Sequence, residues 1–526
     1  MDRFLACCAQ YIYNKHAANL YDICVVLPNR RAGIFFSYYL QRYIRGAVIS
    51  PNIIQINELI YSYSDLYKGD QLKLISILYR IFKKHTKTSE SFDDFYFWGE
   101  VLLSDFNDID NYLVNAEDLY RNISDIKEIE SHFYYLTDEQ RIAISRFWNC
   151  LWQTERRKSS ESFVNMWDKL YPVYRDFNAE LEKRGFAYSG MIYRKVVDKL
   201  RMEGLRFKYG KYYVLGLNAL NNCEKEVFRY LKKEQIVDFL WDYDSYYLED
   251  KINKAGYFMR ENITDFPQPA DFSFSSGSFF HNKKIRMIAV SSVSGQAQEI
   301  PRFLESVNNK PDIEFDSTAI VLADESLLAP ALNAIPPEIP AVNVTMGYPI
   351  INSVIYGFIN LLINLLKNRK LNENNEVMVY HRFITDILNH QILRSIETDR
   401  VNRYLDNIKE TNRLNILLSD LDFSPLHKLI FTTPSELRDF SNYFLDIMAA
   451  LYDIAKDQDF DNKLLPELIY KLYLEIEKLK HLMDDVTTEG EISITESVFF
   501  RLFRQYIGNC SVSYEGEPLN GIQVMG

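Results

Sequence analysis

The chain has 526 residues, which at roughly 100–200 residues per domain corresponds to about three or four domains. Its net charge is −12, so the surface as a whole is not basic. Any binding of DNA or RNA therefore needs a local basic groove, because phosphate contacts dominate that affinity. Glycine and proline are scarce, with 19 and 16 residues, which favours long helices over an all-β or loop-rich chain.

In chain order, residues 1–60 predict the start of an α/β unit. Residues 23–27 are continuously apolar, as in a strand of a parallel sheet that is covered on both faces. The neighbouring patterns predict a helix at 4–13 before this strand, and a helix at 32–43 and a strand at 53–56 after it.

Residues 61–204 are predicted to be almost entirely helical, since apolar side chains recur there at helical spacing. Alternation of strand and helix returns at 205–280, with strands at 212–215 and 236–241 around a helix at 223–233. Residues 267–278 are rich in Ser, Phe and Pro, and their composition predicts a linker.

A second α/β unit is predicted from residue 281, with a strand at 285–290, a helix at 296–307 and a strand at 318–322. The apolar run 350–366 contains three asparagines and is shorter than the roughly 20 residues of a membrane span, so it predicts a buried helix and no membrane association. Residues 371–489 are again predicted to be helical, and strand character returns at 521–525.

The six cysteines include no Cys-x-x-Cys pair, which predicts reduced thiols in a cytoplasmic protein rather than a disulfide framework or a zinc site. The motifs of an ATPase or a nuclease are also missing. A phosphate-binding loop needs Gly-x-x-x-x-Gly-Lys-Ser/Thr, but Gly210-Lys211 is followed by Tyr212. The predicted strand at 212–215 leads to no carboxylate before Glu224, where a magnesium-binding strand would end in acidic residues. We therefore expect neither ATP hydrolysis nor nuclease activity from residues 1–526.

Several segments resemble the motifs of one family. Residues 25–33, Val-Val-Leu-Pro-Asn-Arg-Arg-Ala-Gly, resemble motif Ia of UvrD-like superfamily 1 helicases, in the form found in AddB-type proteins of the Bacteroidetes, which are inactivated helicases. Residues 214–220 with Glu224 are similar to the Walker B segment. Residues 339–349 are similar to a segment of the second motor domain, and 521–526 to the strand that opens motif V.

The resemblance implies an α/β fold with two RecA-like, P-loop-NTPase-like parallel-sheet domains, each carrying an inserted, mostly helical subdomain. The first domain is expected at 1–60 and 205–280 with its insert at 61–204. The second is expected at 281–370 and 490–526 with its insert at 371–489.

The resemblance also implies a non-catalytic helicase-like subunit, or region, of an AddAB-type helicase–nuclease. Such a subunit binds DNA ends in double-strand break processing and recombinational repair, with an AddA-like helicase–nuclease as partner. AddB-type proteins carry a C-terminal PD-(D/E)XK nuclease with an iron–sulfur cluster. This sequence reaches only motif V, so the cluster and magnesium are expected in a nuclease domain outside it, and no cofactor is expected within it.

In this family the motif Ia loop contacts the backbone of single-stranded DNA. Ser292 and Ser294 stand before the predicted helix at 296–307, where they fit either an anion site or an N-capping loop. The candidate nucleic-acid-binding residues are Pro28, Asn29, Arg30, Arg31, Ser292, Ser294 and Thr345.

Three alternatives remain. The chain would be a scaffold if it bound only an AddA-like partner and made no DNA contact of its own; for the loop itself, the alternative to DNA contact is that Arg30 and Arg31 pair with local acids. The chain would be the N-terminal part of an exonuclease if a nuclease domain followed it. An active ATPase or nuclease would need residues that match no known motif.

Overall fold

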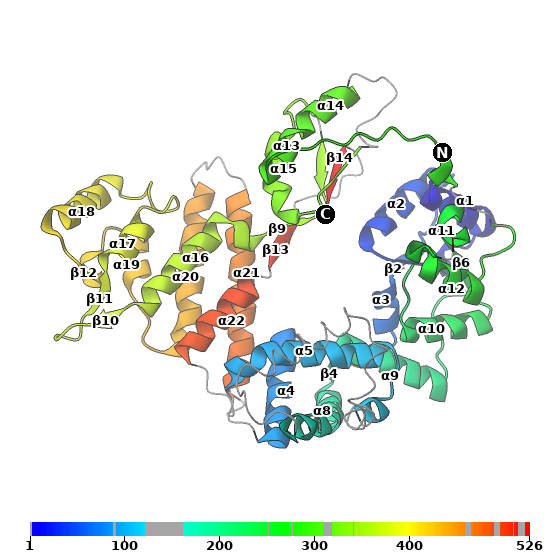
Figure 1. Cartoon of the computed structure of the whole chain (residues 1–526), viewed down its shortest axis with the longest axis horizontal. Helices are drawn as coiled ribbons and strands as arrows, with labels where there is room; N and C mark the ends of the chain where they lie inside the picture. Colours follow the sequence, from blue (N-terminus) through cyan, green and yellow to red (C-terminus); the bar gives the residue numbers. More distant parts are fainter. Residues whose placement is uncertain are drawn as a thin grey trace. The chain divides into compact units, whose positions relative to one another are not determined.

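The computed structural model describes residues 3–87, 91–120, 161–250, 252–272, 274, 277–308, 318–339, 341–457, 464–488, 495–508, 510–513 and 521–526. The chain forms two compact units, unit 1 (Met1–Ile285) and unit 2 (Arg286–Gly526). Figure 1 labels the helices and strands of each. Helices and parallel strands occur together in both units, so the predicted α/β class is confirmed.

The main sheet of unit 1 has four parallel strands in the order β2 (Asn52–Gln55), β1 (Ile23–Leu27), β5 (Lys211–Leu215), β6 (Val237–Leu240). Every residue of β1 is buried, as its continuous apolar pattern predicts. From β1 the chain passes outward to β2 on one side, and β5 and β6 later add on the other side. The strand order therefore reverses between β1 and β5, which is the kind of junction where open α/β sheets bind ligands at the carboxyl ends of their strands.

Helices cover both faces of this sheet. On one face, α1 (Phe4–His16) and α2 (Arg30–Gln41) pack on alternate strand residues, among them Val25 and Leu215. On the other face, Phe239 of β6 contacts Phe228 of α10 (Asn222–Lys233). The two faces differ because successive side chains of a strand point to opposite sides.

The described residues of the predicted linker 267–278 form no helix or strand before the 3-10 turn at Ser278, but part of the segment is packed against the fold. Phe272 is buried against α1, and Asp271 accepts a hydrogen bond from Tyr11 at 2.7 Å and pairs with Lys15 at 2.7 Å. The aromatic residues that made this segment look irregular therefore serve as packing groups. Before it, the chain forms α11 (Ser245–Glu249), a 3-10 turn η4 (Lys254–Gly256) and α12 (Tyr257–Asp265), and after it a 3-10 turn η5 (Ser278–Phe280).

Between β2 and β5 the described chain is mostly helical. It comprises α3 (Ile56–Tyr61), β3 (Tyr67–Lys68), α4 (Gln71–Thr86), α5 (Phe92–Asn111), α8 (Glu161–Arg184), β4 (Phe186–Ala187) and α9 (Ser189–Met202). The apolar residues at helical spacing lie on the covered face of α4: Leu74, Ile75, Leu78 and Phe82 are buried, and Ile81 is partly buried. The short strands β3 and β4 pair in parallel, which no sequence pattern predicted.

The α/β part of unit 2 holds a three-stranded parallel sheet in the order β7 (Ala319–Val321), β14 (Ile522–Met525), β8 (Val342–Val344). The helices α13 (Val293–Gln298), α14 (Ile300–Asn308) and α15 (Leu328–Ala334) accompany it. The predicted helix at 296–307 is divided at Glu299. Pro301 explains the break, since it has no amide hydrogen to donate to the carbonyl four residues earlier.

The strand predicted at 285–290 is wrong. These residues have no regular secondary structure and pair with no strand in the described part of the chain, and Ile285 and Met287 are 80% and 93% exposed. Their apolar character is typical of a strand. A strand also needs a neighbouring strand to form hydrogen bonds with, and the local pattern does not determine whether one is present.

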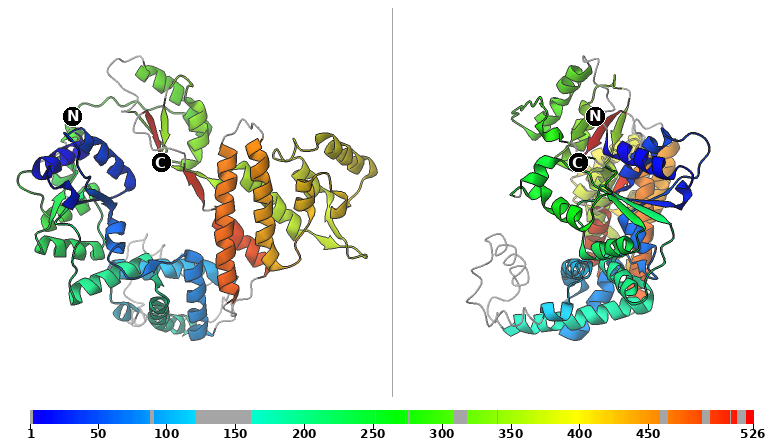
Figure 2. Two further views of the ribbon diagram at one scale, coloured as in Figure 1. Left: turned by 180° about the vertical axis from the view of Figure 1, so that it is seen from behind. Right: turned by 90° about the vertical axis from the view of Figure 1, so that its right-hand side faces the viewer.

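The rest of unit 2 is built on long helices. Figure 2 shows α20 (Leu437–Asp457) and α21 (Leu464–Thr488) side by side. With them occur α16 (Val354–Lys367), α17 (His381–Leu388), α18 (Thr398–Thr411), α19 (Pro425–Phe431) and α22 (Glu496–Gly508). The buried helix predicted at 350–366 is confirmed as α16, preceded by a 3-10 turn. None of the helices in the described ranges combines the length and apolar character needed to cross a membrane.

Two small antiparallel sheets complete unit 2. One orders β10 (Lys370–Leu371), β11 (Val377–Tyr380) and β12 (Asn415–Leu417). The other pairs β13 (Ser511–Ser513) with β9 (Gly347–Pro349). Except for Lys370, the first sheet lies within the region 371–489 that the sequence predicts to be helical, so that region also contains strands.

Candidate functional site

The carboxyl ends of β1, β5 and β6 lie level at one edge of the sheet in unit 1. Val26 is in register with Val214, and Leu215 with Leu240. The loops that begin at Pro28, Gly216 and Trp241 therefore leave the sheet side by side. We refer to these three loops together as the carboxyl edge, and they contain the strongest candidate site because the strand order reverses between β1 and β5.

The first of these loops joins β1 to α2 and holds four of the sequence candidates. Asn29 has extended backbone, and its Oδ1 accepts a hydrogen bond from Ala32 N at 2.9 Å, so it is the N-cap of α2. Pro28, Asn29 and Arg30 are exposed. Arg31 is partly buried, with its guanidinium 5.6 Å from the centre of the Phe35 ring.

This geometry favours an anion. The amide groups of the first turn of α2 and the positive end of its helix dipole face the loop, and two guanidinium groups stand on the same turn. A close approach also fixes α2 beside β2, since a Cβ at Gly33 would lie 3.0 Å from Ile53 Cγ2. The structure thus brings Pro28, Asn29, Arg30 and Arg31 together on one capped helix start.

The loops after β5 and β6 line a cavity of about 550 Å³. Its lining is Gly216, Leu217, Asn218, Asp242, Tyr243, Asp244, Tyr247, Leu248, Ala255, Gly256, Met259, Phe279 and Lys283. No motif of the sequence predicts this cavity, although Asp-Tyr-Asp directly follows the predicted strand at 236–241. Polar residues at the carboxyl end of a parallel strand are the usual position for ligand contacts.

One wall of the cavity is held by Arg260. Its guanidinium donates hydrogen bonds to the carbonyl oxygens of Tyr247 at 2.9 Å and Asn253 at 3.1 Å, and so ties α11 and the turn after it to α12. Gly256 fits closely into this wall, because a Cβ there would lie 1.9 Å from the Tyr247 carbonyl oxygen. These contacts fix the position of this wall of the cavity.

Glu224, at the position that resembles the Walker B acid, caps the start of its own helix, α10. Its carboxylate accepts a hydrogen bond from Asn221 N at 2.9 Å, while Asn221 Oδ1 accepts from Glu224 N at 2.8 Å. This reciprocal capping box starts α10. Burial raises the pKa of Glu224 to about 7, although the hydrogen bond from Asn221 lowers it.

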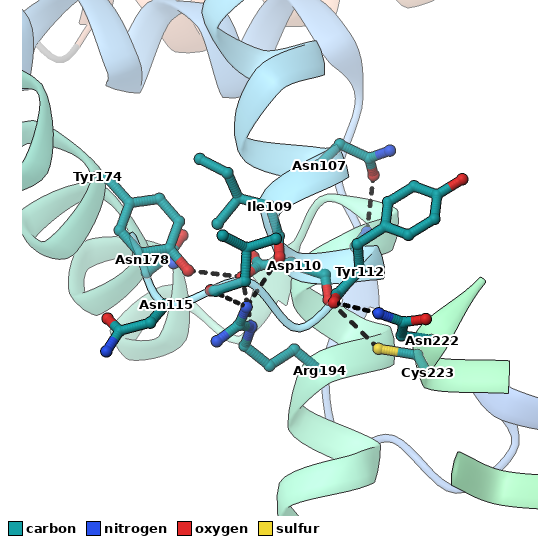
Figure 3. Close-up of polar contacts among 12 residues, drawn as sticks. Asn107, Ile109, Asp110, Tyr112, Asn115, Tyr174, Asn178, Arg194, Asn222 and Cys223 are labelled. Carbon is teal, nitrogen blue, oxygen red and sulfur yellow. Dashed lines mark hydrogen bonds and ion pairs between the residues drawn. The ribbon is translucent and has the colours of Figure 1, made fainter. Parts of the chain in front are cut away.

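At the start of α10, a buried polar cluster around Asp110 joins the helical region to this helix (Figure 3). The Asp110 carboxylate is fully buried and accepts hydrogen bonds from the hydroxyls of Tyr174 and Tyr188, each at 2.5 Å. Arg194 Nε lies 2.7 Å from Asp110 Oδ1, and Cys223 of α10 donates to the Asp110 carbonyl oxygen at 3.3 Å.

Burial is the largest influence on Asp110 and raises the pKa of its carboxyl group, although the two tyrosine hydroxyls and Arg194 lower it. The Arg194 guanidinium also donates to the carbonyl oxygens of Ile109 at 2.8 Å and Val114 at 2.7 Å. These bonds satisfy the Ile109 carbonyl in the last turn of α5 and the Val114 carbonyl in the turn after it, so the cluster supports the structure rather than offering a reactive group.

The remaining candidates belong to unit 2. Ser292 is the N-cap of α13, with its Oγ accepting from Gly295 N at 3.0 Å, which agrees with the N-capping alternative. Ser294 is exposed on the same helix, which has only six residues. Thr345 is exposed directly after β8, and its amide donates to the Val524 carbonyl oxygen at 2.9 Å. Thr345 thus stands at the carboxyl end of a parallel strand, as the loop after β1 does in unit 1.

Among the residues that the structure describes, no three His, Cys, Asp or Glu side chains are grouped to hold a metal ion. Comparison of the sequence with models of known protein families finds no match, and comparison with curated proteins finds none either.

Proposed function

We propose that this chain is a non-catalytic, helicase-like subunit or region that binds DNA in double-strand break processing, within an AddAB-type assembly whose AddA-like partner supplies the motor. The observation that carries this proposal is the loop after β1. Asn29 caps α2 at the carboxyl edge of a parallel sheet and sets Arg30 and Arg31 on its first turn. Phosphate contacts of this kind position a nucleic-acid backbone without reading its bases.

Two further features support the helicase-like assignment. Each unit contains a parallel sheet, and in unit 1 the segment that resembles motif Ia forms the strand, loop and helix that such a motif requires. We propose that both sheets are RecA-like. Support for a non-catalytic role comes from Glu224, whose carboxylate is engaged in the capping box of α10.

The test is single-stranded DNA binding by the double variant Arg30→Gln and Arg31→Gln. Loss of two charge-assisted contacts should weaken binding at least tenfold, since hydrogen bonds to charged groups contribute roughly 1.5–3 kcal/mol each. The slope of log affinity against log salt should fall by about 1.4, because a single strand releases about 0.7 counterion per phosphate contact.

The matched control is the double variant Lys232→Gln and Lys233→Gln. These residues end α10, near the amino end of β6, so the control removes the same charge from the opposite edge of the sheet. It should keep the slope of the unaltered chain. Equal slopes for both double variants would remove the loop after β1 from the proposal. No DNA affinity at low salt, together with stable binding to an AddA-like helicase, would support the scaffold instead.

A further inference from the structure

The cavity at the carboxyl edge contains a carboxylate that no protein group neutralises. Among the described residues, none forms a hydrogen bond or an ion pair with the side chain of Asp242. Burial raises the pKa of Asp242, and no cation in the described part of the chain opposes that rise. A carboxylate that is partly removed from water costs free energy unless a cation or a hydrogen-bond donor approaches it. Asp242 therefore favours a ligand that supplies a positive charge.

The lining includes a lysine, but its ammonium group is directed to other partners. Lys283 Nζ donates hydrogen bonds to the carbonyl oxygens of Phe279 and His281, the second at 3.3 Å. It also lies 5.0 Å from the centre of the Phe279 ring. The lining holds the carboxylates of Asp242 and Asp244 against this single ammonium group, so its charge at neutral pH is negative.

Aromatic side chains form one wall of the cavity, and the protein holds them in place. The Asp244 carboxylate accepts a hydrogen bond from Phe279 N at 3.0 Å. The Tyr246 ring stacks on Phe279 with centroids 3.7 Å apart and planes 10° apart. Tyr247 lies edge-on to Phe279, and its side chain remains 36% exposed. A ring that is already held in position attracts a cation over its face with little further ordering.

Apolar side chains line other parts of the cavity, so a fitting ligand has an apolar part as well as a charge. They belong to Leu217, Leu248, Ala255 and Met259. Asn218 also lines the cavity, and its side chain forms no hydrogen bond with any described residue. An ammonium group donates up to three hydrogen bonds, which suits the oxygens of Asp242 and Asn218.

We infer that this cavity binds a protonated aliphatic amine, with its ammonium group against Asp242 and Tyr247 and its alkyl chain against the apolar side chains. The two partners are complementary, because an ionised carboxylate only accepts hydrogen bonds and an ammonium group only donates them. Free alkyl amines and the side chain of lysine share this chemistry. The inference goes beyond the proposed function, since it needs no DNA and uses no residue of the loop after β1.

The experiment compares two probes, n-pentylamine and n-pentanol, which share an alkyl chain but differ in charge at neutral pH. Titrations of the full chain, followed by saturation-transfer difference NMR, give the two dissociation constants. n-Pentylamine should bind roughly tenfold more tightly, because the alcohol lacks the charge-assisted hydrogen bond to Asp242. Equal affinities for the two probes would overturn the inference.

Asp242→Asn removes the charge and keeps the size of the side chain. This variant should bind n-pentylamine roughly tenfold more weakly and n-pentanol as before. The matched control is Glu234→Gln, which removes the same charge between α10 and β6, at the opposite edge of the sheet. The control should bind both probes like the unaltered chain. If Asp242→Asn kept both its unfolding midpoint and its amine affinity, the amine would not lie against this carboxylate and the inference would fail.

Tyr247→Leu is a second, independent variant. It removes the aromatic ring but keeps an apolar side chain and the main-chain carbonyl that Arg260 holds. Because a ring face attracts a cation more than an alcohol, the affinity for n-pentylamine should fall roughly threefold more than that for n-pentanol. Equal losses for the two probes would contradict the position of the ammonium group against Tyr247.

Two further titrations identify the source of the amine and separate this inference from the proposed function. Nα-acetyl-lysine methylamide carries an ammonium group on a peptide-like backbone. Tighter binding of this compound than of n-pentylamine would support a lysine side chain as the ligand, and weaker binding would support a free amine. The double variant Arg30→Gln and Arg31→Gln should bind n-pentylamine like the unaltered chain while its DNA affinity falls. Absence of amine binding therefore overturns this inference alone, and absence of DNA binding overturns the proposed function alone.

Discussion

Arg194 Nε lies 2.7 Å from Asp110 Oδ1, and the Asp110 side chain is fully buried. Removing one partner of such a pair leaves an uncompensated buried charge, which costs about 3–5 kcal/mol. We therefore expect Arg194→Met to lower the free energy of unfolding by roughly 3 kcal/mol at pH 7, measured by urea denaturation. The loss should shrink as the pH falls, since protonation of Asp110 removes the unpaired charge.

Arg175→Met is the control for this prediction. Arg175 pairs with Asp176 at 2.9 Å, but its side chain is 63% exposed. Exposed pairs contribute about 0–1 kcal/mol, so this variant should unfold within 1 kcal/mol of the unaltered chain. If both variants lost the same free energy of unfolding, the buried Arg194–Asp110 pair would contribute no more to stability than an exposed pair, which would contradict the prediction.

Asn29 provides a test that separates helix capping from DNA binding. Asn29→Ala removes the acceptor for Ala32 N and should destabilise the protein by about 1 kcal/mol. Asn29→Asp keeps the cap and adds a charge that the helix dipole favours, so stability should be retained. The same carboxylate repels phosphate, so DNA affinity should fall in Asn29→Asp. Unchanged affinity in that variant would show that DNA does not approach the start of α2.

The local sequence predicts the elements that surround this site but not the contacts between them. Residues 23–27 match β1 because a continuously apolar run suits a strand buried on both faces. Residues 285–290 are also mostly apolar, yet they pair with no strand among the described residues, because a strand also needs a neighbour. The short pair β3 and β4 was not predicted, since two residues carry no periodicity.

At the candidate site, too, local sequence predicts single elements but not the contacts between distant segments. Asn29 precedes a helical pattern directly, so its capping role follows from local sequence. Asp242 and Phe279 meet at one cavity only because strand order and the packing of η5 bring them together. Asp110 and Arg194 are 84 positions apart in the printed sequence, and neither stands in a motif. Interactions between distant segments depend on topology, which residue pattern does not specify.

Gly256 gives a steric test of the cavity wall. A Cβ at this position would lie 1.9 Å from the Tyr247 carbonyl oxygen and 2.6 Å from an Arg260 nitrogen, so the backbone must shift in Gly256→Ala. We expect a loss of about 1–3 kcal/mol in the free energy of unfolding, as for other overpacked sites.

Gly357→Ala is the matched control, since the nearest atom to its Cβ, His390 Nε2, would lie 4.0 Å away. Gly357 is inside α16, where alanine favours the helix by up to about 1 kcal/mol. This variant should therefore be as stable as the unaltered chain or more stable, and it should bind DNA equally. Destabilisation of both variants to the same degree would contradict the predicted clash at Gly256.

The pH dependence of the free energy of unfolding should show the titration of the Glu224 carboxyl group. Burial raises its pKa in the folded chain to about 7, from an ordinary value of 4.5. A raised folded-state pKa contributes stability that is fully present below pH 4.5 and is lost as the pH rises through 7. Glu224→Gln keeps an oxygen to accept from Asn221 N but carries no charge. At pH 8 this variant should be more stable than the unaltered chain by on the order of 2 kcal/mol, and near pH 4 the difference should vanish.

The pKa of Glu226, on the same helix, is shifted in the opposite direction from that of Glu224. Burial alone would raise its pKa, but hydrogen bonds from Arg201 and Arg229 lower it. A lowered folded-state pKa contributes stability above the ordinary value that is lost as the pH falls. Glu226→Gln should therefore be destabilised relative to the unaltered chain at pH 7 and approach it in acid. Urea denaturation from pH 4 to pH 8 measures both variants, and parallel pH profiles for the two would show that Glu224 does not titrate as a buried cap.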